Sequence, residues 1–118
     1  MIYDLEERVE NFGENIIDFS KKVKITPITK PIIEQLVASG CSIGANYFEA
    51  NGASSKKDFL NKVYIAKKEA KETQHWLRMI VKADNSIKEE AKKLWKEAFE
   101  LTKILSTIII SAKKGNRK

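Results

Sequence analysis

Hydrophobic residues recur at alternating steps of three and four positions in four segments of the chain. In order, the four rows are Leu5, Val9, Phe12, Ile16, Phe19 and Val23; Leu36, Gly40, Ile43, Tyr47 and Ala50; Phe59, Val63, Ala66, Ala70, Thr73, Leu77 and Ile80; and Ile87, Ala91, Leu94, Ala98, Leu101, Leu105, Ile108 and Ala112. This spacing places each row on one face of a helix, and alternating strands cannot produce it. The sequence therefore predicts four helices, each with one buried face.

Residues typical of helix ends separate the four segments. Along the chain these signals are Thr26-Pro27 with Pro31, Asn51-Gly52, Ser55-x-x-Asp58, Asp84-Asn85 and the capping box Ser86-x-x-Glu89. We expect one domain over residues 1–118, with helices at 4–23, 28–51, 55–83 and 86–113 and a basic tail at 114–118. Because the connections are short, neighbouring helices must run antiparallel, and the expected fold is an all-α, up-down-up-down four-helix bundle.

The second predicted helix has an unusual run without formal charge, from Gln35 to Phe48, in a chain that is 32% charged. The side opposite its apolar row, where charges are normal, carries Ala38, Cys41, Ala45 and Phe48. A helix without a charged face is buried all round. Two interpretations follow. These four residues form a contact between copies of the chain, or the small residues allow a close helix crossing inside one protomer.

Length, composition and charge narrow the class of protein. A chain of 118 residues with 42% hydrophobic content supports one globular core. The single cysteine, Cys41, excludes an intrachain disulfide, and the N-terminus lacks a signal peptide, so we expect a cytoplasmic protein without a membrane role. Residues 1–20 hold six acids and one arginine, a net charge of −5. Residues 21–118 therefore carry a net charge of +11, which gives the chain its total of +6. This charge asymmetry is typical of a chain whose basic part binds a polyanion, an acidic surface of a partner, or the acidic helix of the chain itself.

The third predicted helix carries most of the candidate nucleic-acid contacts. One side holds Tyr64 and His75 together with six cations, which are Lys57, Lys67, Lys68, Lys71, Arg78 and Lys82. Such a side can bind the phosphates of RNA or DNA with little sequence preference, or it can simply keep the helix solvated. Tyr64 is the only aromatic residue that this pattern places there for base stacking.

The other flank of the third helix faces the second helix and mixes apolar and polar side chains. We expect a polar cluster of Ser42, Asn46, Glu49, Glu69, Glu72, Thr73 and Trp76. Buried carboxylates need hydrogen-bond donors or a cation, which Lys62 can supply. The cluster is interpreted as a structural network that fixes helix pairing, with a binding pocket as the alternative.

No pattern in the sequence favours catalysis, a metal or a cofactor. Glu72-x-x-His75 has the spacing found in carboxylate-bridged di-metal bundles, but those need a second such motif and the chain has one histidine. Phosphate-binding glycine loops and Cys/His clusters are missing from the sequence. We therefore expect no catalytic residues.

The second and third helices resemble a known family. The pattern is Ser42-Ile43-x-Ala45-Asn46-Tyr47-x-Glu49-Ala50, then Ser55-x-x-Asp58-Phe59, then Ala66-x-x-Glu69-Ala70-x-Glu72-Thr73-x-x-Trp76-Leu77. It is similar to the four-helix-bundle proteins encoded in intervening sequences of 23S ribosomal RNA genes, and in turn to the accessory variability determinant proteins of diversity-generating retroelements. The resemblance implies a homopentameric ring and, for the retroelement relatives, binding of nucleic acid and a reverse transcriptase. The chain departs from the family pattern at Cys41 and Gly44-Ala45, which give the second helix a smaller and more apolar surface than the family pattern leads us to expect.

Two functions remain open at this stage. The first is an oligomeric nucleic-acid-binding or accessory scaffold protein that uses its basic outer faces. The second is a protein-protein interaction module without a nucleic-acid role, for which the fourth helix supplies apolar residues off its row: Trp95, Phe99, Ile104, Ile109 and Ile110.

Overall fold

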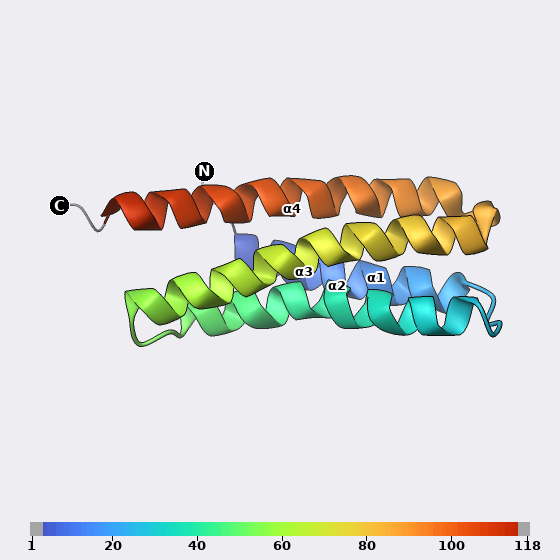
Figure 1. Ribbon diagram of the computed structural model, residues 1–118, viewed down its shortest axis with the longest axis horizontal. Helices are drawn as coiled ribbons and strands as arrows, with labels where there is room; N and C mark the ends of the chain where they lie inside the picture. The colour runs from blue at the N-terminus through green and yellow to red at the C-terminus, as the bar shows by residue number, and fades with distance from the viewer. Residues whose placement is uncertain (1–3, 116–118) are drawn as a thin grey trace.

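The computed structural model describes residues 4–115, which fold into four α-helices without strands (Figure 1). The helices are α1 (Leu5–Lys22), α2 (Thr29–Asn51), α3 (Lys56–Ala83) and α4 (Lys88–Gly115), with a short 3₁₀ turn, η1 (Asn85–Ile87), before α4. The prediction of an all-helical fold is confirmed. None of these helices combines the length and the apolar character needed to cross a bilayer, as far as residues 4–115 are concerned.

The four helices form an elongated antiparallel bundle, about 53 Å in its longest dimension (Figure 1). Each helix packs against the next, and α1 makes a smaller contact with α4, while the backbones of the diagonal pairs α1–α3 and α2–α4 stay further apart in the described part of the chain. Since α1 has 18 residues and both α3 and α4 have 28, the α3–α4 pair extends beyond the start of α1.

The hydrophobic rows form the core. Every member of the first row is buried, as are all members of the third row except the half-buried Phe59. In the fourth row Ala91, Ala98, Leu101 and Leu105 are buried, while Ile87, Leu94 and Ile108 are half-buried and pack against the core. Ile109 was expected off the row, and this expectation is wrong because Ile109 is 5% exposed whereas Ile108 is half-buried. Ile109 follows Leu105 by four residues, as a straight helix of period 3.6 requires.

Side chains accept hydrogen bonds from backbone N–H groups at the starts of α1, α2 and α3. The Asp4 carboxylate accepts a hydrogen bond from the Glu7 N–H, and the Ser55 hydroxyl accepts one from the Asp58 N–H at 3.0 Å. Before α2, the Thr26 hydroxyl accepts from the Thr29 N–H at 3.0 Å, and the Thr29 hydroxyl accepts from the Thr26 N–H at 2.9 Å. This reciprocal pair satisfies two backbone donors at once.

The predicted start and end of the fourth helix both need correction. Ser86 does not cap α4, because its hydroxyl donates to the Asp84 carboxylate at 2.6 Å and Asp84 also accepts from the Ser86 N–H. This arrangement builds η1, so α4 starts at Lys88. At the other end α4 continues to Gly115, and the remainder of the predicted basic tail, 116–118, lies outside the described residues.

Glycines let α1 and α2 approach closely. Gly13 and Gly40 are buried at the crossing, and a β-carbon on Gly13 would contact the Gly40 carbonyl oxygen at 3.6 Å. Gly44 faces Val9 of α1 in the same way. The small-residue crossing inside the protomer is therefore present. It accounts for the glycines of the uncharged run, whereas Ala38, Ala45 and Phe48 remain exposed.

Candidate nucleic-acid interface

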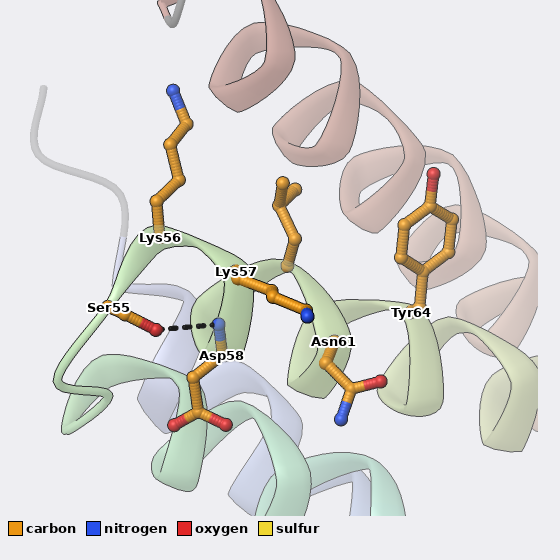
Figure 2. A pocket seen from close by; sticks show the side chains of 7 residues that line it. Ser55, Lys56, Lys57, Asp58, Asn61 and Tyr64 are labelled. Carbon is orange, nitrogen blue, oxygen red and sulfur yellow. Dashed lines mark hydrogen bonds between the residues drawn. The ribbon is translucent and has the colours of Figure 1, made fainter.

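The six predicted cations are distributed along the outer side of α3. Lys67, Lys68 and Lys71 line a shallow groove together with Tyr64, Glu72 and His75. Lys57 belongs to a hollow at the start of the helix, beside Asn61 (Figure 2). Arg78 lines a third groove that α3 shares with α4, and Lys82 is exposed in the last turn. The cations thus follow the whole length of α3 without converging on one point.

Most of these charges lack an internal partner. Among the six, and within residues 4–115, only Lys68 has a carboxylate within ion-pair distance, Glu69 at 3.7 Å, and the Lys68 side chain is 62% exposed. Cations that form no ion pair remain available to an external anion, although Glu72 contributes one negative charge to the groove of Lys67, Lys68 and Lys71.

The fourth helix adds cations and aromatic rings to this side, which the sequence did not indicate. Lys88, Lys92 and Lys96 line the shared groove with Arg78 and Trp95. The Trp95 and Phe99 rings stack at 5.7 Å between centroids and 12° between planes.

Aromatic rings on this surface are therefore more numerous than expected. The Lys113 ammonium lies 5.2 Å from the centre of the Tyr64 ring, which Figure 2 shows beside α4. Trp95 and Phe99 are 39% and 43% exposed. Their relation to α3 depends on how the two helices are rotated about their axes, and a single sequence does not reveal that.

The acidic first helix does not cover the basic side within the protomer. Within residues 4–115 its backbone packs closely against α2 and, less extensively, α4, and does not come close to the backbone of α3. Its ion pairs with α4 use basic residues instead: Arg8 donates to Glu97 at 2.6 and 2.7 Å, and Lys22 donates to Glu90 at 3.0 Å. These pairs hold two α4 carboxylates on the flank that faces α1.

The predicted polar cluster between α2 and α3 is divided into local groups. The Asn46 amide donates to the Ser42 carbonyl oxygen at 2.9 Å, within α2. Lys62 pairs with Glu49 at 2.8 Å across the two helices. Glu72 is exposed, so its expected place in a buried network is wrong.

Thr73 joins the two helices through a residue outside the predicted cluster. Its hydroxyl oxygen lies 3.0 Å from the hydroxyl oxygen of Ser39 and 2.8 Å from the Glu69 carbonyl oxygen, and both hydroxyl side chains are buried. Trp76 is half-buried and places its ring edge-on to His75, with 4.7 Å between centroids. The Thr73–Ser39 and Lys62–Glu49 pairs thus join α2 to α3, whereas the Asn46–Ser42 and Trp76–His75 contacts each lie within one helix.

Burial and neighbouring charges raise the pKa of three side chains, Glu69, Lys62 and Cys41. Burial raises the pKa of the Glu69 carboxyl, the neighbouring Glu72 charge raises it further, and Lys68 opposes both effects. The hydrogen bond and charge of Glu49 raise the pKa of Lys62. Burial raises the pKa of the Cys41 thiol, which disfavours the reactive thiolate. The described residues contain no group of three or more His, Cys, Asp or Glu side chains arranged to hold a metal.

The predicted oligomer contact lies on a different face of the bundle. Phe48 is 63% exposed, Ala38 and Ala45 are exposed, and Cys41 is half-buried. Phe48, Ala45 and Cys41 line a groove between α1 and α2 with Ile17. Glu10, Glu14 and Glu49 lie along the same groove, which gives this face an acidic border.

Comparison with known proteins identifies a family and a similar solved structure. The sequence matches the family model described as 23S rRNA-intervening sequence protein over residues 4–107. The fold is similar to a solved structure of a protein of unknown function from the S23 ribosomal protein family, from Bacteroides thetaiotaomicron VPI-5482. The two chains are 32% identical, with a TM-score of 0.80 over 90% of this chain and 98% of that one. No curated protein matches the sequence.

Proposed function

Since the chain belongs to the 23S rRNA-intervening sequence protein family, we propose that it is a non-enzymatic accessory protein that binds nucleic acid as a homo-oligomer. We propose further that the oligomer is a pentameric ring and that the chain is related to the accessory variability determinant proteins, as the sequence resemblance implies. Nucleic acid is bound through phosphates, so recognition depends little on sequence.

The observation that carries the proposal is the basic surface shared by α3 and α4. It combines two grooves. The first is lined by Lys67, Lys68 and Lys71 of α3, and the second by Arg78 of α3 with Lys88, Lys92 and Lys96 of α4. The α4 carboxylates Glu90 and Glu97 are engaged on the opposite flank. A phosphate chain that follows α3 therefore meets cations along its length.

Assembly strengthens this surface without adding contacts to any single protomer. Copies of the chain arranged in a ring present the basic face several times, and linked weak sites gain affinity from their high effective concentration. The exposed Ala38, Ala45 and Phe48 on α2 supply the contact between copies in this proposal.

An electrophoretic mobility assay with RNA and DNA, run as a salt series, tests the function. Retardation at low salt should fall steeply as salt rises, because each neutralised phosphate releases counterions. The variant Lys67→Glu/Lys68→Glu/Lys71→Glu should lose retardation. The matched variant Lys21→Glu/Lys24→Glu/Lys30→Glu has the same net charge and should retain most of it. If both triple variants lost retardation equally, binding would depend on net charge alone, and the proposal of a defined interface on α3 would be overturned.

The alternative is a protein-interaction module without a nucleic-acid role. It is favoured by Ile110, which is 54% exposed on the same helix as Trp95 and Phe99. If the wild type retards neither RNA nor DNA at low salt, the alternative replaces the proposal.

A further inference from the structure

The groove between the C-terminal half of α3 and the N-terminal half of α4 combines an apolar floor with a cationic border. Leu77, Val81, Ala91 and Trp95 form its apolar part. Arg78, Lys88, Lys92 and Lys96 form its charged part, and the lining contains no acidic residue. Its volume of about 390 Å³ is at the small end of the roughly 300 to 1,000 Å³ typical of small-molecule sites. A planar, partly apolar group attached to an anion matches this lining.

We propose that this groove holds an unpaired base of single-stranded nucleic acid against the Trp95 indole, with the flanking phosphates on Arg78 and the α4 lysines. The inference rests on the proposed function and makes it more specific, because it names the strand form and the residues that receive it. Base–aromatic stacking tolerates any base, since every base has a π face.

The arrangement of the rings leaves one side of the indole available. Phe99 is one turn further along α4 and stacks on Trp95, but Phe99 does not line the groove. The groove therefore opens on the side of Trp95 away from Phe99. The Lys103 ammonium lies 5.1 Å from the centre of the Phe99 ring. A bound base thus completes a continuous stack of base, Trp95 and Phe99, which ends in a cation.

The spacing of the lysines favours a strand over a free nucleotide. Lys88, Lys92 and Lys96 follow one another by four residues, which is about 6 Å along the axis of α4. This step is of the same order as the separation of successive phosphates in an extended single strand. In a duplex the bases are stacked inside the helix and cannot reach Trp95, so the groove discriminates against paired nucleic acid.

Tryptophan fluorescence and anisotropy test the inference directly. Trp76→Phe leaves Trp95 as the only tryptophan, and its emission should be quenched by oligothymidylate or oligouridylate and not by a duplex of equal length. Trp95→Ala should weaken binding of the labelled single strand by roughly 5- to 150-fold, the range expected for one stacked base. Trp95→Phe, which keeps a stacking ring, should restore most of the affinity, and circular dichroism should show equal helicity in all variants.

A pair of charge variants separates this inference from the proposed function. Lys92→Gln/Lys96→Gln should reduce the salt dependence by about one unit of slope for each lost phosphate contact, whereas Lys21→Gln/Lys24→Gln should not. If the wild type binds neither strand form, the proposed function and the inference both fall. If it binds but Trp95→Ala and the wild type have equal affinity, or if duplex and single strand bind equally, only the inference is overturned.

Discussion

The backbone of Gly40 lies directly against the side chain of Ile16, so that a β-carbon on Gly40 would stand 2.9 Å from Ile16 Cγ1 and 3.0 Å from Ile16 Cγ2. Ile16 is fully buried and branched at Cβ, so it has few rotamers with which to move aside. This contact sets how closely α1 and α2 can approach. Any larger residue at position 40 must separate the two helices.

Gly40→Ala should therefore destabilise the protein, although alanine favours a helix more than glycine does. Overpacking costs about 1 to 3 kcal/mol, which exceeds the gain in helix propensity of about 0.5 to 1 kcal/mol. Gly44→Ala is the matched control. Its β-carbon would meet the Val9 carbonyl oxygen at 3.4 Å, an ordinary contact, so its stability should be unchanged or slightly higher. Urea unfolding of both variants measures the difference, and equal stability of the two would contradict this account.

The buried Ser39–Thr73 pair should contribute to the packing of α2 on α3. Ser39→Ala and Thr73→Val should each lower the free energy of unfolding by about 0.5 to 1.5 kcal/mol, the usual net value of one hydrogen bond. Because the two hydroxyl oxygens are 3.0 Å apart, the double variant should cost less than the sum of the single variants. A double-mutant cycle measures this coupling. Strictly additive losses would mean that each hydroxyl acts only within its own helix.

The stability of the protein should depend on the ionisation of Glu69. Its pKa is raised in the folded state, so the folded protein binds the proton more tightly than the unfolded chain does. The resulting stabilisation is complete below the ordinary glutamate pKa of about 4.3 and is lost as the pH rises through the higher folded value. Glu69→Gln should therefore raise the melting temperature relative to wild type at neutral pH, and this advantage should shrink in acid.

Glu72→Gln is the informative control for that experiment. It should produce a smaller increase in melting temperature at neutral pH, because it removes only the charge that repels the Glu69 carboxylate. Thermal unfolding followed by circular dichroism at several pH values gives both curves. A melting temperature of Glu69→Gln below that of wild type at neutral pH would show that the charged carboxylate is stabilising.

Ala45→Glu should dissociate the proposed oligomer while leaving each protomer folded. Ala45 is exposed in the protomer, so glutamate is tolerated there, but a charge without a partner is costly inside a contact between copies. Sedimentation equilibrium measures the mass of the assembly, and far-UV circular dichroism measures the retained helicity. Ala83→Glu, at an exposed position in the last turn of α3, should assemble normally. Normal assembly of Ala45→Glu would exclude α2 from the contact.

Most of the fold could be predicted from the sequence because it depends on local periodicity. The first row is a complete example: Leu5 to Val23 are spaced for one helical face, and all six residues are buried. Ser55 and Asn51-Gly52 also mark helix ends in the expected places. These features depend on residues within one or two turns of each other, which the sequence shows directly.

The remaining features depend on how one helix is placed against another. The exchange of Ile108 for Ile109 in the core follows from the gradual rotation of α4 relative to a strict heptad. Trp95 reaches the same groove as Arg78 because of the relative rotation of α3 and α4. Gly40 and Gly44 could equally have served a contact between copies, and only the position of Ile16 and Val9 assigns them to the crossing inside the protomer.

The order in which the helices pack has a consequence for how the chain folds. Extensive contacts join helices that are adjacent in sequence, and the α1–α4 contact, which joins the two helices furthest apart in sequence, is small. Folding rates of small domains rise as contacts become more local. The chain should therefore fold on the order of microseconds to milliseconds, as helical bundles do, and much faster than a β-protein of the same length. Because α1 is short and touches α4 only lightly, its amides should exchange with solvent at lower cost than those of α3, which is packed between α2 and α4.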